Sequence, residues 1–401
     1  MLTPEPAAGA RTLEVGQGRP YATIRLALAA VHPGDTVRVH PGVYTEGNLL
    51  IDKPITLVGI GRPTLDGQHE YEVITVQASN VRIAGFRIEH TGIRHTIDLA
   101  GVKVLASDSV TVEDNRFFDC YFAVYLSNTN GCTVRNNHIE GNPKEEMNTG
   151  NGIHLWKCTR AVVEGNTVRQ QRDGIYFEFV TDSDIRNNTS EDNIRYGLHF
   201  MFSHNDRYTG NRFNRNNAGV AVMYSKQVFM EDNDFGLNWG EAAYGLLLKD
   251  ISDSEVVRNR FGRNTAAVYM EGSSRIAFSE NIFADNGWAL RVQASCMDVS
   301  FRRNVFTGNT FDVSTNGHVT LNRFEENYWD KYEGYDLNRD GVGDVPFRPV
   351  SLYAMVVERM PAGILLIRSF MVYLLDKAEK VIPAITPEGL VDNTPRMQIP
   401  E

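Results

Sequence analysis

The sequence predicts an all-β fold, a single-stranded parallel β-helix, from three observations. An asparagine recurs in one local frame, apolar–x–x–Asn–x–apolar, mostly at steps of 22 or 23 residues. A short strand with a small first residue recurs beside it, and glycine is abundant, at 34 of 401 residues. A period near 22 is too short for two helices and fits one solenoid coil, so about a dozen coils are expected. The recurring residues are Asn115, Asn137, Asn166, Asn188, Asn211, Asn233, Asn259, Asn281, Asn304 and Asn327.

The asparagines are expected to be structural. In register at the strand spacing of ~4.8 Å, their amides can hydrogen-bond from coil to coil as a ladder. The recurring strand reads small, apolar, variable, apolar, variable, as in Gly152-Ile-His-Leu-Trp. Because strand side chains alternate between faces, its second and fourth positions should point inward and its third and fifth outward.

The chain divides into four expected segments. Residues 1–20 are expected to be an N-terminal tail, and residues 21–330 to form the β-helix. Within the latter, residues 21–31 are expected to form a helix that caps the end of the solenoid. Residues 331–350 form an Asp/Gly-rich loop, and 351–401 a docking segment. Insertions in the repeat mark loops on one face, often the binding face. The residues expected on those partner loops are His90, His95 and Met147.

Composition excludes some classes of function. The net charge is −10 with both signs interspersed, which argues against a nucleic-acid partner. The start lacks the charged and apolar regions of a signal peptide, so the chain is either cytosolic or numbered after its removal. The cysteines fall at different offsets of the repeat, which favours free thiols, although a Cys120–Cys132 bridge stays open.

The outward columns of the recurring strand hold a candidate copper site. His199 and Met201 lie two apart on one face, and Glu178 and Met223 each lie one coil from Met201. His154 lies two coils from His199. Thioether and imidazole form a soft ligand set suited to Cu(I). The alternative is a lateral apolar patch in which methionine fills space under a loop or partner.

Two further motifs lie near the C-terminus. Asp336-x-Asn338-x-Asp340-Gly341 resembles half of an EF-hand loop, with Asp344 a substitute for the missing glutamate. Structural Ca²⁺ and a metal-free turn both fit it. The apolar stretch near 363–375 is too short to span a bilayer. It is either a helix capping the solenoid or a docking segment for a membrane partner, through Ile364, Leu365, Leu366, Phe370 and Leu374.

These motifs together resemble the NosD family over nearly the whole chain. The resemblance is carried by segments that begin at Asn151, Asp173, Arg195, Gly219, Tyr244, Asn327 and Asp340, and by the apolar segment ending at Asp376. It implies a right-handed, pectate-lyase-like parallel β-helix in the periplasm, with the signal peptide removed. It also implies a non-catalytic role in maturing nitrous oxide reductase for denitrification, by supplying copper to its copper–sulfide cluster. The implied partners are an ABC-type permease with its ATPase, a copper-chaperone lipoprotein and the reductase.

Two other functions fit the same pattern. The first is a polysaccharide lyase, hydrolase or epimerase, because the fold alone does not exclude one. Glycoside hydrolysis needs two carboxyl groups about 5–10 Å apart, and Glu178 and Glu271 are four coils apart, although Asp173 and Glu178 are close enough in sequence to pair around a corner. The second is a metal-free scaffold that presents the reductase to the transporter.

Overall fold

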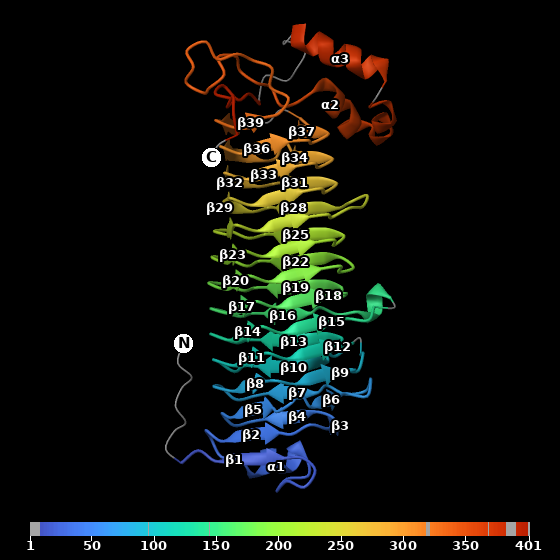
Figure 1. Ribbon diagram of the computed structural model, residues 1–401, viewed down its shortest axis with the longest axis vertical. Coiled ribbons are helices and arrows are strands. Elements are labelled where there is room, and N and C mark those ends of the chain that lie inside the picture. Colours follow the sequence, from blue (N-terminus) through green and yellow to red (C-terminus); the bar gives the residue numbers. More distant parts are fainter. Residues whose placement is uncertain are drawn as a thin grey trace. The chain divides into compact units, whose positions relative to one another are not determined.

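The computed structural model describes residues 9–94, 96–143, 145–317, 321–367, 369–381 and 390–399. The chain forms two compact units, Met1–Arg207 and Tyr208–Glu401. In each unit, strands of successive turns pair in parallel and build three sheets (Figure 1). The predicted parallel β-helix is therefore confirmed.

In unit 1, from β2 onward, every third strand of the chain belongs to the same sheet, and β1 precedes β2 in the first sheet. The first sheet holds β1 (Thr12–Val15), β2 (Thr36–Val39), β5 (Thr56–Gly59), β8 (Arg82–Ala84), β11 (Thr111–Glu113), β14 (Thr133–Arg135), β17 (Val162–Glu164) and β20 (Asp184–Arg186). The second sheet holds β4 (Leu49–Ile51), β7 (Ile74–Val76), β10 (Ala100–Leu105), β13 (Phe122–Ser127), β16 (Ile153–Trp156), β19 (Asp173–Glu178) and β22 (Tyr196–Met201). The third sheet holds β3 (Val43–Tyr44), β6 (Thr64–Asp66), β9 (Arg87–Glu89), β12 (Arg116–Phe118), β15 (His138–Glu140), β18 (Thr167–Arg169) and β21 (Thr189–Glu191).

Unit 2 repeats the arrangement, and β23 (Arg207–Thr209) lies at the division between the units. Its first sheet holds β26 (Phe229–Glu231), β29 (Ser252–Val257), β32 (Ser274–Ser279), β35 (Met297–Arg302) and β38 (Arg323–Glu325). The second sheet holds β25 (Ala218–Met223), β28 (Tyr244–Lys249), β31 (Ala266–Glu271), β34 (Trp288–Val292) and β37 (Phe311–Ser314). The third sheet holds β24 (Arg212–Asn214), β27 (Asp234–Gly236), β30 (Arg260–Gly262), β33 (Ile282–Ala284), β36 (Val305–Thr307) and β39 (Tyr328–Trp329).

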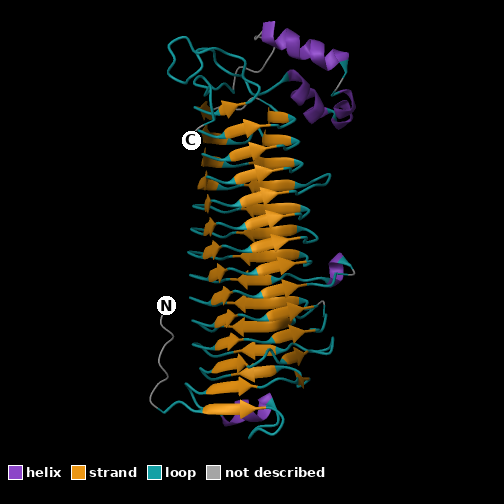
Figure 2. Ribbon diagram, viewed as in Figure 1, coloured by secondary structure: helices purple, strands orange, loops and turns teal. Residues whose placement is uncertain are grey.

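Few helices accompany the strands, and they lie outside the sheets (Figure 2). Helix α1 (Ile24–Ala30) begins where the Thr23 hydroxyl accepts from the Leu26 amide, as an N-cap does. It buries Ile24 and Leu28, as a cap of the solenoid end must. Strand β1 precedes this helix and pairs with β2, so the solenoid begins earlier than the expected residue 21. A short 3₁₀ turn, η1 (Glu146–Asn148), lies in the insertion after β15.

The recurring asparagines form the expected ladder within each unit. In unit 1, Nδ2 of Asn137 donates to Oδ1 of Asn166 at 3.0 Å, and Asn166 donates to Asn188 at 3.0 Å. Each amide also donates to a backbone carbonyl of a preceding coil, as Asn166 does to Val134 at 2.9 Å. A buried amide without partners costs ~1–3 kcal/mol, so the ladder specifies asparagine at these positions.

The ladder of unit 2 ends on a carboxylate that the sequence reading did not single out. Asn327 donates from Nδ2 to Oδ2 of Asp392 at 3.0 Å, and the indole of Trp329 donates to the same oxygen at 3.0 Å. Asp392 thereby satisfies the last amide of the row. The C-terminal segment that contains Asp392 is therefore part of the fold of this unit.

The helices after the solenoid are α2 (Leu352–Arg359), the 3₁₀ helix η2 (Pro361–Leu366) and α3 (Phe370–Val381). Helix α2 covers the end of the second sheet, where the rings of Tyr353 and Phe311 lie 5.7 Å apart between centroids. Arg291 of β34 also forms an ion pair with Glu358 at 2.7 Å. Helix α2 thus covers this end of the sheet, and it precedes the apolar stretch near 363–375. Of that stretch, Val372 is buried in the same cluster.

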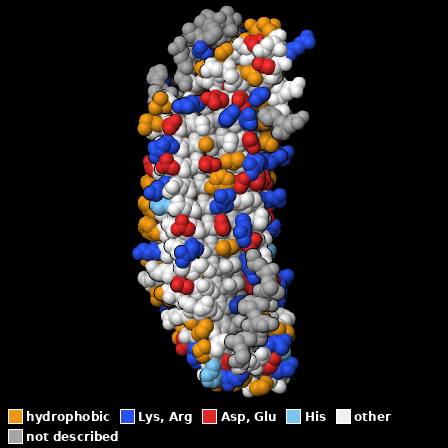
Figure 3. All heavy atoms as spheres, turned by 90° about the vertical axis from the view of Figure 1, so that its left-hand side faces the viewer, with side chains coloured by type: hydrophobic (Ala, Val, Ile, Leu, Met, Phe, Trp, Pro, Cys, Tyr) orange, Lys and Arg blue, Asp and Glu red, His pale blue; other side chains and the backbone are white. Residues whose placement is uncertain are grey.

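The outer face seen in Figure 3 carries basic and acidic side chains side by side. Ion pairs also link neighbouring coils within each unit, such as Arg186 with Glu164 at 3.0 Å and Arg275 with Asp253 at 2.6 Å. A nucleic-acid partner would need a basic face, and this face carries both signs of charge. The four cysteines are free and buried, so no Cys120–Cys132 bridge forms.

Candidate functional site

The candidate copper residues of unit 1 lie on the second sheet, where strand register places them in two columns. The pairs Tyr125↔His154, His154↔Tyr176 and Tyr176↔His199 form the first column, which we call the ring column. The pairs Trp156↔Glu178 and Glu178↔Met201 belong to the second column. The predicted one-coil stacking is therefore correct within this unit.

The alternation of faces is also as predicted on the inner side. Residues at the second and fourth strand positions, such as Ile175, Phe177, Leu198 and Phe200, are fully buried. On the outer side the ring column covers itself. Its ring centroids lie 4.8, 4.7 and 5.1 Å apart in order, so each ring shields the next from solvent.

His154 is neutral and held by an amide. Burial, aided by the nearby Arg172, lowers the pKa of His154 to about 3. Nδ2 of Asn151 lies 3.1 Å from its Nδ1, and Arg172 donates to Oδ1 of Asn151 at 3.3 Å, which fixes the amide orientation. Because an amide nitrogen can only donate, Nδ1 of His154 accepts and Nε2 carries the proton. Its geometry thus favours a structural partner over a metal.

His199 differs from His154 in having no such partner. Its side chain is buried, with 8% of the residue exposed, although the sequence predicted an outward position. Tyr176 and Tyr196 enclose the ring, with centroids 5.1 and 4.8 Å away. Within the described part of the chain, neither ring nitrogen of His199 has a hydrogen-bond partner. A buried nitrogen without a hydrogen-bond partner costs free energy.

A buried ion pair lies behind His199. Arg195 donates from Nε and Nη2 to both oxygens of Asp173, at 3.0 and 2.8 Å. Nδ1 of His199 lies 3.8 Å from Oδ2 of the same carboxylate, beyond hydrogen-bond distance. Burial opposes the charge on Asp173, but the neighbouring His199 and Arg195 outweigh it and lower the pKa of this carboxyl. The negative charge favours a cation at the imidazole.

The other candidate ligands lie at strand ends. Met201 closes β22 and is half-buried beside Glu178, whose Oε2 accepts from the Tyr176 hydroxyl at 3.4 Å. Asp173 and Glu178 stand at opposite ends of β19 with separate partners, so the pairing that a hydrolase would need does not form. Met223 closes β25 of unit 2 and is also half-buried. Its role as a ligand stays a prediction of the repeat.

The expected partner-loop residues meet different outcomes. His90 directly follows β9, is half-buried, and lies against the ring of His69, tilted by 37° with 4.5 Å between the centroids. His95 and the side chain of Met147 lie outside the described residues. The backbone of Met147 belongs to η1.

The predicted calcium residues lie in one loop and bind its backbone. Asp336 accepts from the amides of Arg339 at 2.6 Å and Gly341 at 2.9 Å. Asp340 accepts from the Val342 amide, and Asp344 from the Leu337 amide, at 2.8 and 2.7 Å. Asn338 is linked to Asp340 by its amide at 3.0 Å. These bonds build the turn by themselves, so the metal-free interpretation accounts for the residues, and Ca²⁺ stays a prediction.

The expected docking residues are exposed. Leu365 is 85% exposed and Phe370 74%, and Ile364, Leu366 and Leu374 are exposed as well. Met371 and Tyr373 extend this apolar set on α3. Among the described residues, no helix is long and apolar enough to cross a membrane.

Sequence reasoning missed Asp173, Arg195 and Tyr196 as neighbours of His199. The repeat carried a signal for two of them. Asp173 directly precedes Gly174, and Arg195 lies two residues before Gly197, the equivalent small residue of the next coil. It also missed His69 and Asp119 beside His90. Asp119 is identifiable by register, since it follows β12 as His90 follows β9.

Known proteins resemble this chain in architecture and in sequence. Residues 60–157 match the family described as right-handed beta helix region, and residues 139–334 match that described as periplasmic copper-binding protein (NosD). The probable ABC transporter binding protein NosD of Pseudomonas aeruginosa is 30% identical over 386 residues, which cover 88% of this chain and 86% of that protein. The chain belongs to the NosD family.

A second relative in the NosD family has the same description. It comes from Stutzerimonas stutzeri and is 26% identical over 384 residues, covering 90% of this chain and 87% of that protein. Both relatives are named as binding proteins. Among solved structures, the catalytic unit of a GH87 α-1,3-glucanase from Streptomyces thermodiastaticus matches with a TM-score of 0.58 and 16% identity, covering 81% of this chain and 67% of that one. A likeness at this identity shows the fold alone.

Proposed function

We propose that this chain is a non-catalytic periplasmic binding protein of an ABC-type transporter, and that it carries Cu(I) for the copper–sulfide cluster of nitrous oxide reductase. The family description and the names of the two relatives support the compartment, the copper and the transporter. The permease with its ATPase, a copper-chaperone lipoprotein and the reductase are the proposed partners.

One observation carries the copper proposal: the buried imidazole of His199 has no hydrogen-bond partner among the described residues and lies on the strand that ends in Met201. Imidazole and thioether are ligands that suit Cu(I). The charge of Asp173, 3.8 Å from the ring, compensates that of a bound cation. Glu178 beside Met201 adds a second carboxylate.

The test is an anaerobic competition titration with Cu(I) and a chromogenic chelator. The unmodified chain should bind one equivalent. His199→Asn with Met201→Leu should weaken binding at least about tenfold, which is ~1.4 kcal/mol. The matched control is His138→Asn with Met297→Leu, which removes an exposed imidazole and an exposed thioether elsewhere.

Three results would contradict the proposal. Equal Cu(I) affinity in the variant and the control would remove His199 and Met201 from the site. An absence of stoichiometric binding, alone and with the chaperone lipoprotein, would favour the metal-free scaffold. Cleavage of uronate polymers by the isolated chain would instead favour an enzyme.

A further inference from the structure

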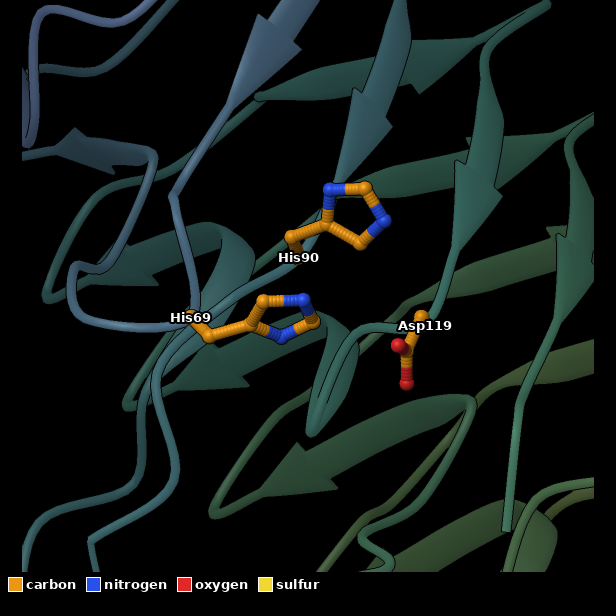
Figure 4. A group of neighbouring side chains, drawn as sticks. All are labelled: His69, His90 and Asp119. Atoms are coloured by element: carbon orange, nitrogen blue, oxygen red, sulfur yellow. The ribbon is translucent and has the colours of Figure 1, made fainter.

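A second group of metal-ligating side chains lies in unit 1, on the third sheet and away from the ring column. His90 and Asp119 directly follow β9 and β12, and His69 lies in the turn after β6. One ligand atom from each residue lies within 4.8 Å of the others. Figure 4 shows both imidazole rings reaching toward the side on which the carboxylate of Asp119 lies. Three consecutive coils thus place two imidazoles and a carboxylate together.

The tautomer of His90 leaves a nitrogen free for a metal. Its Nδ1 lies 3.2 Å from Oδ1 of Asp66. Because a carboxylate oxygen accepts, Nδ1 carries the proton and Nε2 keeps its lone pair. A carboxylate behind a ligating imidazole is the arrangement that orients such ligands in metal sites. Asp66 is itself fixed by the amide of Gln68, which donates to it at 2.8 Å.

The side chains are accessible to an ion from solvent. His69 is exposed, and His90 and Asp119 are half-buried. Ligand atoms bound to one ion at ~2.1 Å lie no more than ~4.2 Å apart. The three ligand atoms lie within 4.8 Å of one another, and rotation of the exposed His69 side chain can bring its imidazole closer to the other two residues.

We propose that His69, His90 and Asp119 form a binding site for a divalent transition metal, with Cu(II) the preferred ion. Imidazole and carboxylate suit Cu(II) and Zn(II), whereas a soft Cu(I) site needs sulfur ligands, which this group lacks. For a given nitrogen and oxygen ligand set, Cu(II) binds more tightly than Zn(II). The remaining coordination positions face solvent and take water. This site goes beyond the proposed carriage of Cu(I) and does not depend on His199.

The experiment is aerobic titration of the full chain with Cu(II), followed by electron paramagnetic resonance and by the thermal unfolding midpoint. The unmodified chain should take up one equivalent with a nitrogen-coupled spectrum and a raised midpoint. His69→Ala and Asp119→Asn should each weaken the site at least about tenfold. Asparagine tolerates the left-handed backbone of position 119, where φ is 50°.

Two controls separate this site from others. His138→Ala removes an imidazole that lies 4.0 Å from Glu140 on the same sheet, and should change nothing. His199→Asn with Met201→Leu should also leave Cu(II) uptake intact. A failure of the Cu(I) proposal can therefore be told apart from a failure of this one. Cu(II) uptake by His69→Ala equal to that of the unmodified chain, or uptake lost equally in His138→Ala, would overturn the proposal. Zn(II) should compete only where His69 is present.

Discussion

Nδ1 of His199 lies 3.8 Å from Oδ2 of Asp173, in reach of its charge but beyond a hydrogen bond. The same carboxylate is already held by two donors of Arg195. The imidazole therefore lies next to a negative charge without forming a hydrogen bond to it. This relationship separates His199 from His154, whose Nδ1 accepts from Asn151.

A first prediction concerns the stability of the metal-free chain. His199→Phe keeps the ring contacts with Tyr176 and Tyr196 but removes both unpartnered nitrogens. It should raise the free energy of unfolding by about 1 kcal/mol while abolishing Cu(I) binding, because a ligand site held ready is costly when empty. Chemical denaturation with and without Cu(I) measures both effects. A destabilised variant would show that the imidazole is a satisfied core residue.

A second prediction concerns pH and Asp206. Burial raises the pKa of Asp206 to about 8. Its Oδ1 accepts from the Ser183 amide at 2.9 Å, and its Oδ2 has no hydrogen-bond partner among the residues that the structure describes. In the unfolded chain the carboxyl ionises near pH ~4, so from there to about pH 8 the folded state binds more protons and stability falls as pH rises. Asp206→Asn should therefore stabilise the chain at pH 8 by about 1 kcal/mol or more, and less toward pH 4.

Unfolding midpoints at several pH values measure this difference. Asp298→Asn, at an exposed left-handed position of another turn, is the control and should show no such trend. If the stability difference between Asp206→Asn and the unmodified chain grew as pH falls, it would contradict a raised pKa for Asp206.

A third prediction concerns the asparagine ladder. Asn166→Ala removes an amide that donates to Asn188 and Val134 and accepts from Asn137. It leaves buried groups of both neighbours unpaired, so the loss in the free energy of unfolding should be about 2–4 kcal/mol. The exposed Asn393→Ala should cost little. Equal losses in the two variants would show that the ladder adds nothing to stability.

A fourth prediction concerns the exposed apolar residues of η2 and α3. Leu365→Glu with Phe370→Glu should leave folding unchanged, because both side chains are exposed, but should prevent recovery of the permease in a membrane pull-down. Leu337→Glu, at an exposed leucine of the 331–350 loop, is the control. Equal recovery of the permease with the unmodified chain, the double variant and the control would contradict docking through this segment.

The sequence predicts the solenoid well because its period is encoded in residues that few other structures require. Each ladder asparagine has to meet the one in the next coil, so spacing alone gives the register of Tyr176 with His199 and of Glu178 with Met201. Inward positions follow from strand alternation.

The burial of His199 could not be predicted in the same way. It depends on Tyr196 and on the Asp173–Arg195 ion pair, whose side chains lie outside the alternating pattern of the strand. His69 was missed because its turn precedes the first coil with a ladder asparagine, where the repeat gives no register. Asp392 was missed because it reaches Asn327 from 65 residues away.

The most direct test is X-ray absorption of the Cu(I)-loaded chain at the copper edge. The account predicts at least one sulfur and one imidazole nitrogen around the metal, with the sulfur contribution reduced by Met201→Leu and the imidazole contribution lost in His199→Asn. A copper environment of nitrogen and oxygen alone, unchanged in both variants, would contradict it.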